Sequence, residues 1–244
     1  MFVANVVATR ATLDAASAAG VARSVYASTV NVFGDTHARV VDETYVRPQA
    51  AEFLSYYDET KYLAHLEAET RIAAGAPILI AMPGMVYGPG DPSQVGATVR
   101  QAMTGRLPIL SAPDLGGNLV HVDDVAAGML LIHDRGRVGE AYVLGGEITT
   151  LRELVRRAAA VAGQPAPRLT TPSWLLHALV PFGPLIGPAL GGEPNLAEAV
   201  RASDGVTYWA SDARAREELG YAPRDLEAGL KTMLAARTRT EVEP

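Results

Sequence analysis

Hydrophobic positions in the N-terminal part of the chain follow two alternating patterns. Residues 2–19 carry Ala, Val and Leu at helical spacing and stop at Gly20, which predicts a helix. Residues 21–29 form a short β-branched and aromatic run, which predicts a buried strand. The alternation repeats, with a helix expected at about 55–74 and a continuous apolar strand at 77–82. Helices that alternate with short buried strands are typical of a parallel sheet covered by helices.

The pattern changes after Asp91, where Pro- and Gly-rich passages separate the expected elements. Asp123 or Asp124 is expected to cap one helix, and a capping box from Thr150 to Glu153 opens another. The remaining expected elements are helices at 93–104, 125–133 and 150–162, strands at 118–121 and 141–144, and a final pair of helices from 211 onward. Residues 1–91 therefore form one predicted domain, to which 118–145 return. Residues 92–117 and 146–244 form a second, mostly helical region.

Composition and charge exclude several classes of protein. The chain has 244 residues, 48% of them hydrophobic, and a formal net charge of −6. Its Lys and Arg residues are scattered, so no nucleic-acid partner is expected. Cysteine is absent, which excludes disulfides and thiolate metal sites, and the histidines show no metal-ligand spacing. No metal site is therefore expected.

A membrane partner is not expected either. The longest apolar stretch, Trp174–Leu190, is interrupted by Pro181, Pro184 and Pro188. It predicts a broken, buried or pocket-lining segment better than a membrane span. Residues 1–5 lack the basic region of a signal peptide. These features predict a soluble, cytoplasmic protein.

The richest chemical signal is Tyr57-Asp58-Glu59-Thr60-Lys61. Residues four apart on a helix lie on one face, so Tyr57 and Lys61 are within reach of each other. A neighbouring ammonium favours the phenolate and lowers a tyrosine pKa from its usual value of about 10, which prepares the pair for proton transfer. The spacing alone also occurs by chance. It gains weight because Thr29 and Pro83 come at the carboxyl ends of predicted parallel strands, where functional groups gather.

Further segments match one family in its own order. They are Asn5–Thr9, Val25–Gly34, Asp42-Glu43, Tyr57 with Lys61, Pro83–Asp91, His121–Ala126 and Ala213–Tyr221. Together they resemble the extended short-chain dehydrogenase/reductase family, the NAD-dependent epimerase/dehydratases, over nearly the whole chain. The resemblance implies an α/β fold with a Rossmann-like parallel sheet, N-terminally incomplete here, and a smaller, mostly helical C-terminal substrate domain.

The resemblance also assigns roles to residues. Tyr57 would be the acid or base, and Lys61 would lower its pKa and bind the cofactor ribose. Thr29 would hold the substrate oxygen. Side chains alternate along a strand, so only one of Ser28 and Thr29 faces the site, and the resemblance places the family's hydroxyl at the spacing from Gly34 that Thr29 occupies. Tyr57, Lys61, Pro83 and Val86 would contact NAD or NADP, whose nicotinamide carries the hydride.

Other polar residues receive structural interpretations. His121 is expected to cap the turn that follows it, outside the catalytic site. Asp42 and Glu43 are adjacent on a loop, where their side chains diverge, so we expect a solvated pair. A homodimer through the helices near 2–19 and 55–74 is expected by analogy with the family.

Two departures from the family leave the function open. The Thr-Gly-x-x-Gly-x-x-Gly turn that binds pyrophosphate is absent, so we expect missing first strands, an exposed apolar edge and poor dinucleotide affinity. Met82 and Met85 stand where many relatives carry Arg and Asn, which favours a less polar substrate. The first hypothesis is an NAD(P)-dependent oxidoreductase or epimerase/dehydratase acting on a small molecule. The alternatives are an NADPH-dependent carbonyl reductase, dihydroflavonol-reductase-like or hydroxysteroid-dehydrogenase-like, and a catalytically silent fragment that cannot hold cofactor.

Overall fold

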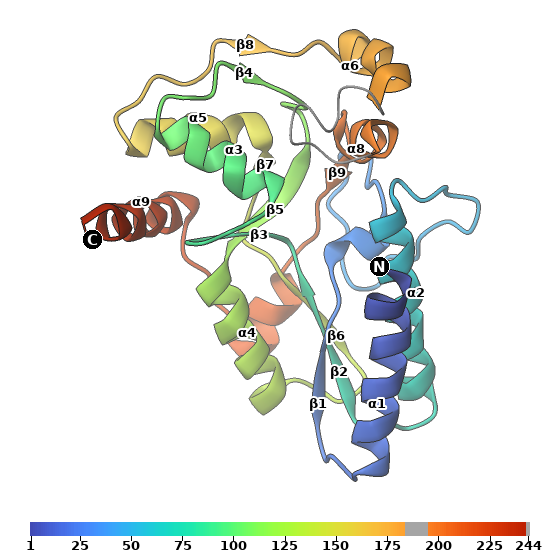
Figure 1. Cartoon of the computed structure of the whole chain (residues 1–244). Coiled ribbons are helices and arrows are strands. Elements are labelled where there is room, and N and C mark those ends of the chain that lie inside the picture. The colour runs from blue at the N-terminus through green and yellow to red at the C-terminus, as the bar shows by residue number, and fades with distance from the viewer. Residues whose placement is uncertain (184–194, 243–244) are drawn as a thin grey trace.

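The computed structural model describes residues 1–183 and 195–242 (Figure 1). The helices are α1 (Ala8–Ala18), α2 (Tyr56–Ala73), α3 (Gln94–Met103), α4 (Val122–Arg135), α5 (Leu151–Val161), α6 (Ser173–Leu179), α8 (Leu196–Ser203) and α9 (Leu226–Val242), with short helical turns η1 (Val3–Val7), η2 (Val30–Phe33), η3 (Val180–Phe182) and η5 (Ala215–Leu219). The strands are β1 (Ser24–Ala27), β2 (Ile78–Pro83), β3 (Met85–Tyr87), β4 (Ile109–Leu110), β5 (Gly116–His121), β6 (Ala141–Leu144), β7 (Glu147–Thr150), β8 (Leu169–Thr170) and β9 (Thr207–Tyr208).

The first sheet is parallel, with the strand order β1-β2-β6. Residues 78–82 of its central strand are buried and point alternately to two faces. Ile78, Ile80 and Met82 pack toward α1 and α2, whereas Leu79 and Ala81 pack toward α4. Figure 1 shows these helices on opposite sides of the sheet. The prediction of a parallel sheet covered by helices is confirmed.

The second sheet is built around β5. This strand pairs in parallel with β3 and β9 and antiparallel with β7. Helices α3, α5 and α9 supply most of the apolar side chains that pack with it. Strands β4 and β8 form a separate parallel pair nearby (Figure 1).

A single glycine joins the two sheets. Gly84 separates the end of β2 from the start of β3, and its amide donates to the carbonyl of Leu144 in β6. A Cβ atom at this position would lie 2.2 Å from the backbone oxygen of Asn118 in β5. Only glycine allows this approach. The crossing brings the carboxyl ends of β1 and β2 next to the second sheet.

Several predicted elements are found close to their expected limits, and others are not. The helices at α2, α3 and α5 and the strand β6 agree within one or two residues. β1 ends at Ala27, earlier than predicted, because Thr29 caps η2 by accepting a hydrogen bond from the Asn31 amide. α4 starts at Val122, and its cap is His121; the prediction of an Asp123 or Asp124 cap is wrong.

The expected solvated pair at 42–43 is also corrected. The Glu43 side chain is only 3% exposed, and its Oε1 accepts a hydrogen bond from the Val143 amide in β6. Burial raises the pKa of Glu43. Asp42 does face its own turn, where it accepts hydrogen bonds from Thr44. The Glu43 carboxylate therefore joins the loop to β6, whereas the Asp42 carboxylate stabilises only its own turn.

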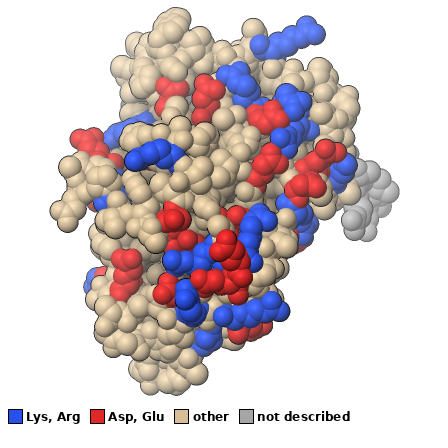
Figure 2. Space-filling model, turned by 180° about the vertical axis from the view of Figure 1, so that it is seen from behind, with Lys and Arg blue, Asp and Glu red and all other residues tan. Residues whose placement is uncertain are grey.

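The proline-interrupted apolar stretch begins with α6 and η3, and residues 184–190 of it lie outside the described part. Within 1–183 and 195–242, no helix is both long and apolar enough to cross a membrane. On the face shown in Figure 2, basic and acidic side chains lie interspersed. The absence of a nucleic-acid partner stays a prediction.

Candidate active site

Helix α2 places the candidate acid–base residues at the carboxyl end of β1. Ser55 caps the helix by accepting a hydrogen bond from the Asp58 amide at 3.0 Å. Tyr57, Lys61 and His65 then recur at every fourth position, which is one face of a helix. The Lys61 ammonium donates to the Ala27 carbonyl at 3.2 Å, so this face is turned toward the strand end.

Thr29 lies beside Tyr57, and Ser28 points elsewhere. The Thr29 hydroxyl donates to Asn31 Oδ1 at 3.1 Å and also contacts the Tyr57 side chain. The Ser28 hydroxyl lies 2.8 Å from Nδ1 of the buried His65, whose Nε2 is 3.3 Å from Glu69 Oε1. Thr29 therefore lies beside the tyrosine, whereas the hydrogen bond between Ser28 and His65 joins the end of β1 to α2.

The pKa of Tyr57 reflects its burial and its charged neighbour. Partial burial raises its pKa, and the charge of Asp58 raises it further, against a smaller lowering by the Thr29 hydroxyl. The Lys61 ammonium is held by the Ala27 carbonyl, and burial lowers its own pKa. Lys61 is not among the groups that shift the pKa of Tyr57 here, and its effect on Tyr57 stays a prediction. Tyr57 carries its proton at neutral pH, and it can therefore donate it.

A cavity of about 380 Å³ opens beside Tyr57, between the end of the first sheet and the second sheet. The volume lies in the range of small-molecule sites. Its apolar lining is Val30, Met85, Val86, Val95, Leu115 and Ala202, and its polar lining is Asn31, Ser55, Tyr57, Asp58, Ser93 and Tyr208. Among the described residues that line it, none is Lys or Arg.

Several residues that line the cavity were not predicted as site residues, among them Asn31, Asp58 and Tyr208. The buried Asp58 carboxylate accepts hydrogen bonds from Asn31 Nδ2 at 3.0 Å and from the Tyr208 hydroxyl at 3.4 Å. Asp58 lies inside the Tyr57–Lys61 motif, so its position was a visible signal that it borders the site. Tyr208 is 150 positions away in the chain, and no sequence pattern joined it to the motif.

The predicted cofactor residues divide between two places. Val86 lines the cavity with Tyr57, whereas Pro83 ends β2 and pairs with Leu144 of β6. The donors present fit the ribose and nicotinamide end of a dinucleotide: a phenol and an ammonium one helical turn apart, beside an apolar wall. Over residues 1–183 and 195–242, no group of His, Asp and Glu side chains is arranged to hold a metal ion.

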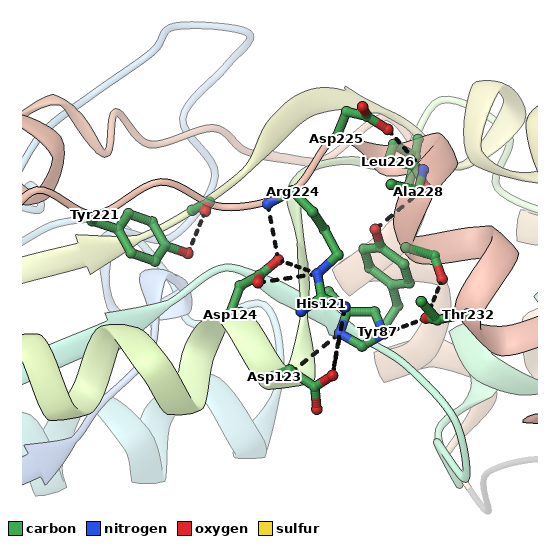
Figure 3. A network of polar contacts seen from close by, with 12 residues as sticks. Tyr87, His121, Asp123, Asp124, Tyr221, Arg224, Asp225, Leu226, Ala228 and Thr232 are labelled. Carbon is green, nitrogen blue, oxygen red and sulfur yellow. Dashed lines mark hydrogen bonds and ion pairs between the residues drawn. The ribbon is translucent and has the colours of Figure 1, made fainter.

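A second polar cluster surrounds His121 at the end of β5, and its groups are satisfied internally (Figure 3). His121 Nδ1 accepts the Asp123 amide at 3.2 Å, and Nε2 lies 2.9 Å from the Thr232 hydroxyl. Arg224 Nε binds both carboxylate oxygens of Asp124, at 3.0 and 2.9 Å. Burial and the Arg224 charge lower the pKa of His121, so the ring is neutral. The interpretation of His121 as a structural cap is confirmed.

Comparisons with known proteins agree with this arrangement. The family model of the NAD dependent epimerase/dehydratase family matches residues 1–145. A putative dihydroflavonol 4-reductase of Synechocystis is 31% identical over 238 residues, which cover 94% of this chain and 68% of the relative. A 2-alkyl-3-oxoalkanoate reductase of Stenotrophomonas maltophilia is 27% identical and covers 96% and 74% of the two chains.

The crystal structure of gox2253 superposes with a TM-score of 0.83 at 31% identity, covering 98% of this chain and 73% of that one. A match of this extent to both sequence and structure, on a Rossmann-like α/β architecture, fixes the family and its dependence on a nicotinamide cofactor. This chain belongs to the NAD-dependent epimerase/dehydratase family.

Proposed function

We propose that this protein reduces the carbonyl group of an apolar small molecule, with NADH or NADPH as the reductant. The observation that carries the proposal is the cavity beside Tyr57, whose walls are largely apolar and whose described lining contains no Lys or Arg. A diphosphate group of a sugar nucleotide needs cationic partners, which this lining does not offer. A neutral, apolar ketone matches it better.

Tyr57 can supply the proton that carbonyl reduction requires. A tyrosine pKa is ordinarily near 10, and burial raises that of Tyr57, so the hydroxyl carries its proton at neutral pH. In the proposed reaction, the Tyr57 and Thr29 hydroxyls orient the substrate oxygen. A bound nicotinamide supplies the hydride to the carbonyl carbon. The Tyr57 O–H bond breaks as the oxygen takes the proton, an alcohol forms, and the tyrosinate regains a proton from solvent.

The names of two relatives support the same class of reaction. The Synechocystis relative is called a putative dihydroflavonol 4-reductase, and the Stenotrophomonas relative is called a 2-alkyl-3-oxoalkanoate reductase. Both names describe reductases. We transfer only the reaction class to this chain and infer the substrate class from the residues that line its own cavity.

The test is a reductase assay with a matched pair of variants. NADH or NADPH consumption is followed with acetophenone and ethyl acetoacetate as probes, beside a UDP-glucose sample analysed for epimerisation or dehydration. We expect ketone reduction in the wild type and a loss on the order of 10²-fold or more in Tyr57→Phe, the size of a general acid contribution. Tyr56→Phe, one position earlier on the helix, should keep full activity.

Two results would overturn the proposal. Turnover of UDP-glucose with no ketone reduction would favour a sugar-nucleotide epimerase or dehydratase. No turnover of any probe, together with no binding of NADH or NADPH by calorimetry, would favour the catalytically silent alternative. Retained activity in Tyr57→Phe would remove Tyr57 as the proton donor.

We also propose that two copies of the chain associate through η1, α1 and α2. Val3 and Val7 of η1 and Phe2 just before it expose apolar side chains, and Leu66 exposes one on the adjoining α2. A shallow hollow between these elements includes Phe2 and Leu66. An exposed apolar patch that spans two packed helices is typical of an interaction surface.

Light scattering on a sizing column tests this association. The double variant Val3→Glu/Leu66→Glu should elute as a monomer where the wild type is a dimer. Leu130→Glu, at an exposed apolar position on α4, is the control and should leave the mass unchanged. A monomeric wild type at micromolar concentration would contradict the proposal.

A further inference from the structure

The two-stranded sheet of β4 and β8 presents apolar side chains to solvent. Ile109 and Leu169 are paired across this parallel ladder, and they are 47% and 63% exposed. Side chains alternate between the two faces of a strand, and the next residue, Leu110, is buried in the core with side chains of α3 and α5. One face of the ladder is therefore covered, and the other carries two large apolar side chains in contact with water.

Trp174 extends this apolar surface onto α6, and its side chain is 70% exposed. The Thr171 amide, just after β8, donates to the Leu110 carbonyl in β4, and α6 begins at Ser173. Figure 1 shows β4, β8 and α6 together along the upper edge of the molecule. Exposed apolar patches mark interaction sites, and a tryptophan ring suits a boundary between an apolar phase and water. The β4–β8 surface is defined here as Ile109, Leu169 and Trp174.

The segments that carry the β4–β8 surface contain cationic residues and no acidic ones. Residues 105–112 and 164–182 include Arg106 and Arg168 but neither Asp nor Glu. Within the part of the chain that the structure describes, neither arginine forms an ion pair. The whole chain has a formal net charge of −6, so these segments differ in charge from the rest of the protein.

Asp204 contacts α6 without adding a free negative charge there. Its side chain is 14% exposed, its Oδ1 accepts the Ser173 hydroxyl at 2.9 Å, and its Oδ2 lies 3.2 Å from His177 Nε2. Asp204 follows the last residue of α8, whose Ala202 lines the cavity beside Tyr57. The β4–β8 surface is therefore joined through α6 and α8 to one wall of the cavity.

We propose that the β4–β8 surface docks the protein on a bilayer that contains anionic lipids. The three apolar side chains enter the boundary between headgroups and acyl chains, where tryptophan is favoured. Arg106 and Arg168 attract the lipid phosphates. A protein partner usually presents charges of both signs, whereas a rim of cations alone matches anionic headgroups. The sequence predicted no membrane partner because its apolar stretch is broken by prolines, but docking on a surface needs no spanning segment.

Docking has a consequence for the candidate site. An apolar ketone partitions into a bilayer, so a docked protein meets this substrate at a higher concentration than a protein in solution does. This consequence rests on the proposed carbonyl reduction. The docking itself does not.

The direct test is flotation of the protein with vesicles, without substrate or cofactor. Vesicles of phosphatidylcholine are compared with vesicles of phosphatidylcholine and phosphatidylglycerol, and we expect binding to the anionic ones. Ile109→Glu/Leu169→Glu should weaken this binding on the order of 10-fold or more, because it removes apolar insertion and adds repulsion. Arg106→Gln/Arg168→Gln should weaken it on the order of 10-fold. Leu130→Glu, at an exposed apolar position on α4, is the matched control and should bind like the wild type.

The fluorescence of Trp174 tests docking without a change in the surface charge. The chain has two tryptophans, and Nε1 of the other one, Trp209, is buried. Anionic vesicles with brominated acyl chains should quench part of the wild-type emission, and unbrominated vesicles should not. Trp174→Phe should lose this quenching and still float with the vesicles.

Four results would overturn the docking proposal. They are a folded wild type that does not float with anionic vesicles, a loss of flotation in Leu130→Glu as large as that in Ile109→Glu/Leu169→Glu, quenching that persists in Trp174→Phe, and a wild-type dimer that Ile109→Glu/Leu169→Glu converts to a monomer. The last result would assign the β4–β8 surface to a second copy of the chain.

Docking and the proposed function can fail separately. If vesicles are bound and no ketone is reduced, the reductase proposal fails and the docking stands. If ketones are reduced and no vesicle is bound, only the docking fails. If both hold, Ile109→Glu/Leu169→Glu should slow the reduction of a long-chain ketone delivered in anionic vesicles, and it should leave the reduction of dissolved acetophenone unchanged.

Discussion

Two polar clusters lie at the ends of parallel strands in this fold, and they differ in whether their central residue is accessible. One follows β1 and centres on Tyr57; the other ends β5 and centres on His121. His121 is 1% exposed, and both of its ring nitrogens have partners within the protein. Tyr57 is 42% exposed and borders a cavity.

The difference shows how to distinguish a polar residue that is available for catalysis from one that only stabilises the fold. Histidine is the residue that most often transfers protons near neutral pH. Here the Asp123 amide occupies its Nδ1, so Nε2 carries the proton and donates to Thr232, whose hydroxyl donates to the Gly229 carbonyl. A tyrosine beside an open cavity keeps the capacity that this histidine has lost. Accessibility, more than residue type, marks the candidate site.

The largest expected contrast comes from Lys61. Lys61→Met removes an ammonium that is held by one backbone carbonyl and partly desolvated, so the free energy of unfolding should change little. We expect ketone reduction to fall on the order of 10²-fold, because the cation that would bind the cofactor ribose is gone. Turnover and thermal unfolding are measured together. Lys231→Met, at an exposed ion pair with Glu227, should change neither turnover nor stability. A loss of stability without a loss of turnover in Lys61→Met would contradict the prediction.

The next effect should fall on stability alone. Arg224→Ala leaves the mostly buried Asp124 carboxylate without the guanidinium that contacts both of its oxygens. We expect a loss of about 2 kcal/mol in the free energy of unfolding, measured by urea titration, since the carboxylate loses its cation and keeps only the backbone amide of residue 224. The kcat of the folded fraction should be unchanged. A drop in kcat larger than the folded fraction explains would place the His121 cluster in the chemistry.

The smallest effect is the pH dependence contributed by His121. Burial lowers its pKa in the folded protein below the unfolded value of about 6.5. The unfolded chain therefore gains a proton first as the pH falls, so this contribution to stability is complete above about 6.5 and is lost below it. His121→Asn keeps a helix cap and removes the titration. The gap in unfolding free energy between the two proteins should be wider at about pH 8 than at about pH 5.5; a constant gap would show that His121 does not titrate in this way.

The sequence predicted helix starts and the central strand correctly, because residues close in the chain determine these features. Ser55, Ser93 and Thr150 start α2, α3 and α5 because each side chain accepts an amide of its own first turn. The apolar run at 77–82 gave the central strand because both of its faces are buried. The short strands β3, β4, β7, β8 and β9 were missed, since two to four residues carry too little periodicity to stand out.

The candidate site divides in the same way. Tyr57 and Lys61 were found through helical spacing, and Thr29 was preferred to Ser28 because the family resemblance places a hydroxyl at its spacing from Gly34. Glu43 was misjudged because its partner, the Val143 amide, lies 100 positions away. The pKa of Tyr57 is raised by burial and by the charge of Asp58, and the spacing of the motif reveals neither cause.

By itself, the sequence determined that an amphipathic helix carries Tyr57 and Lys61 on one face beside the end of a buried strand. Spacing and capping decide such features, and both act within a few residues. The tertiary structure decided that Ser28 belongs to His65, that Asp58 is buried under Asn31 and Tyr208, and that a cavity opens beside Tyr57. Those outcomes depend on segments that meet only when the two sheets pack at Gly84, because burial and charge act through space and not along the chain.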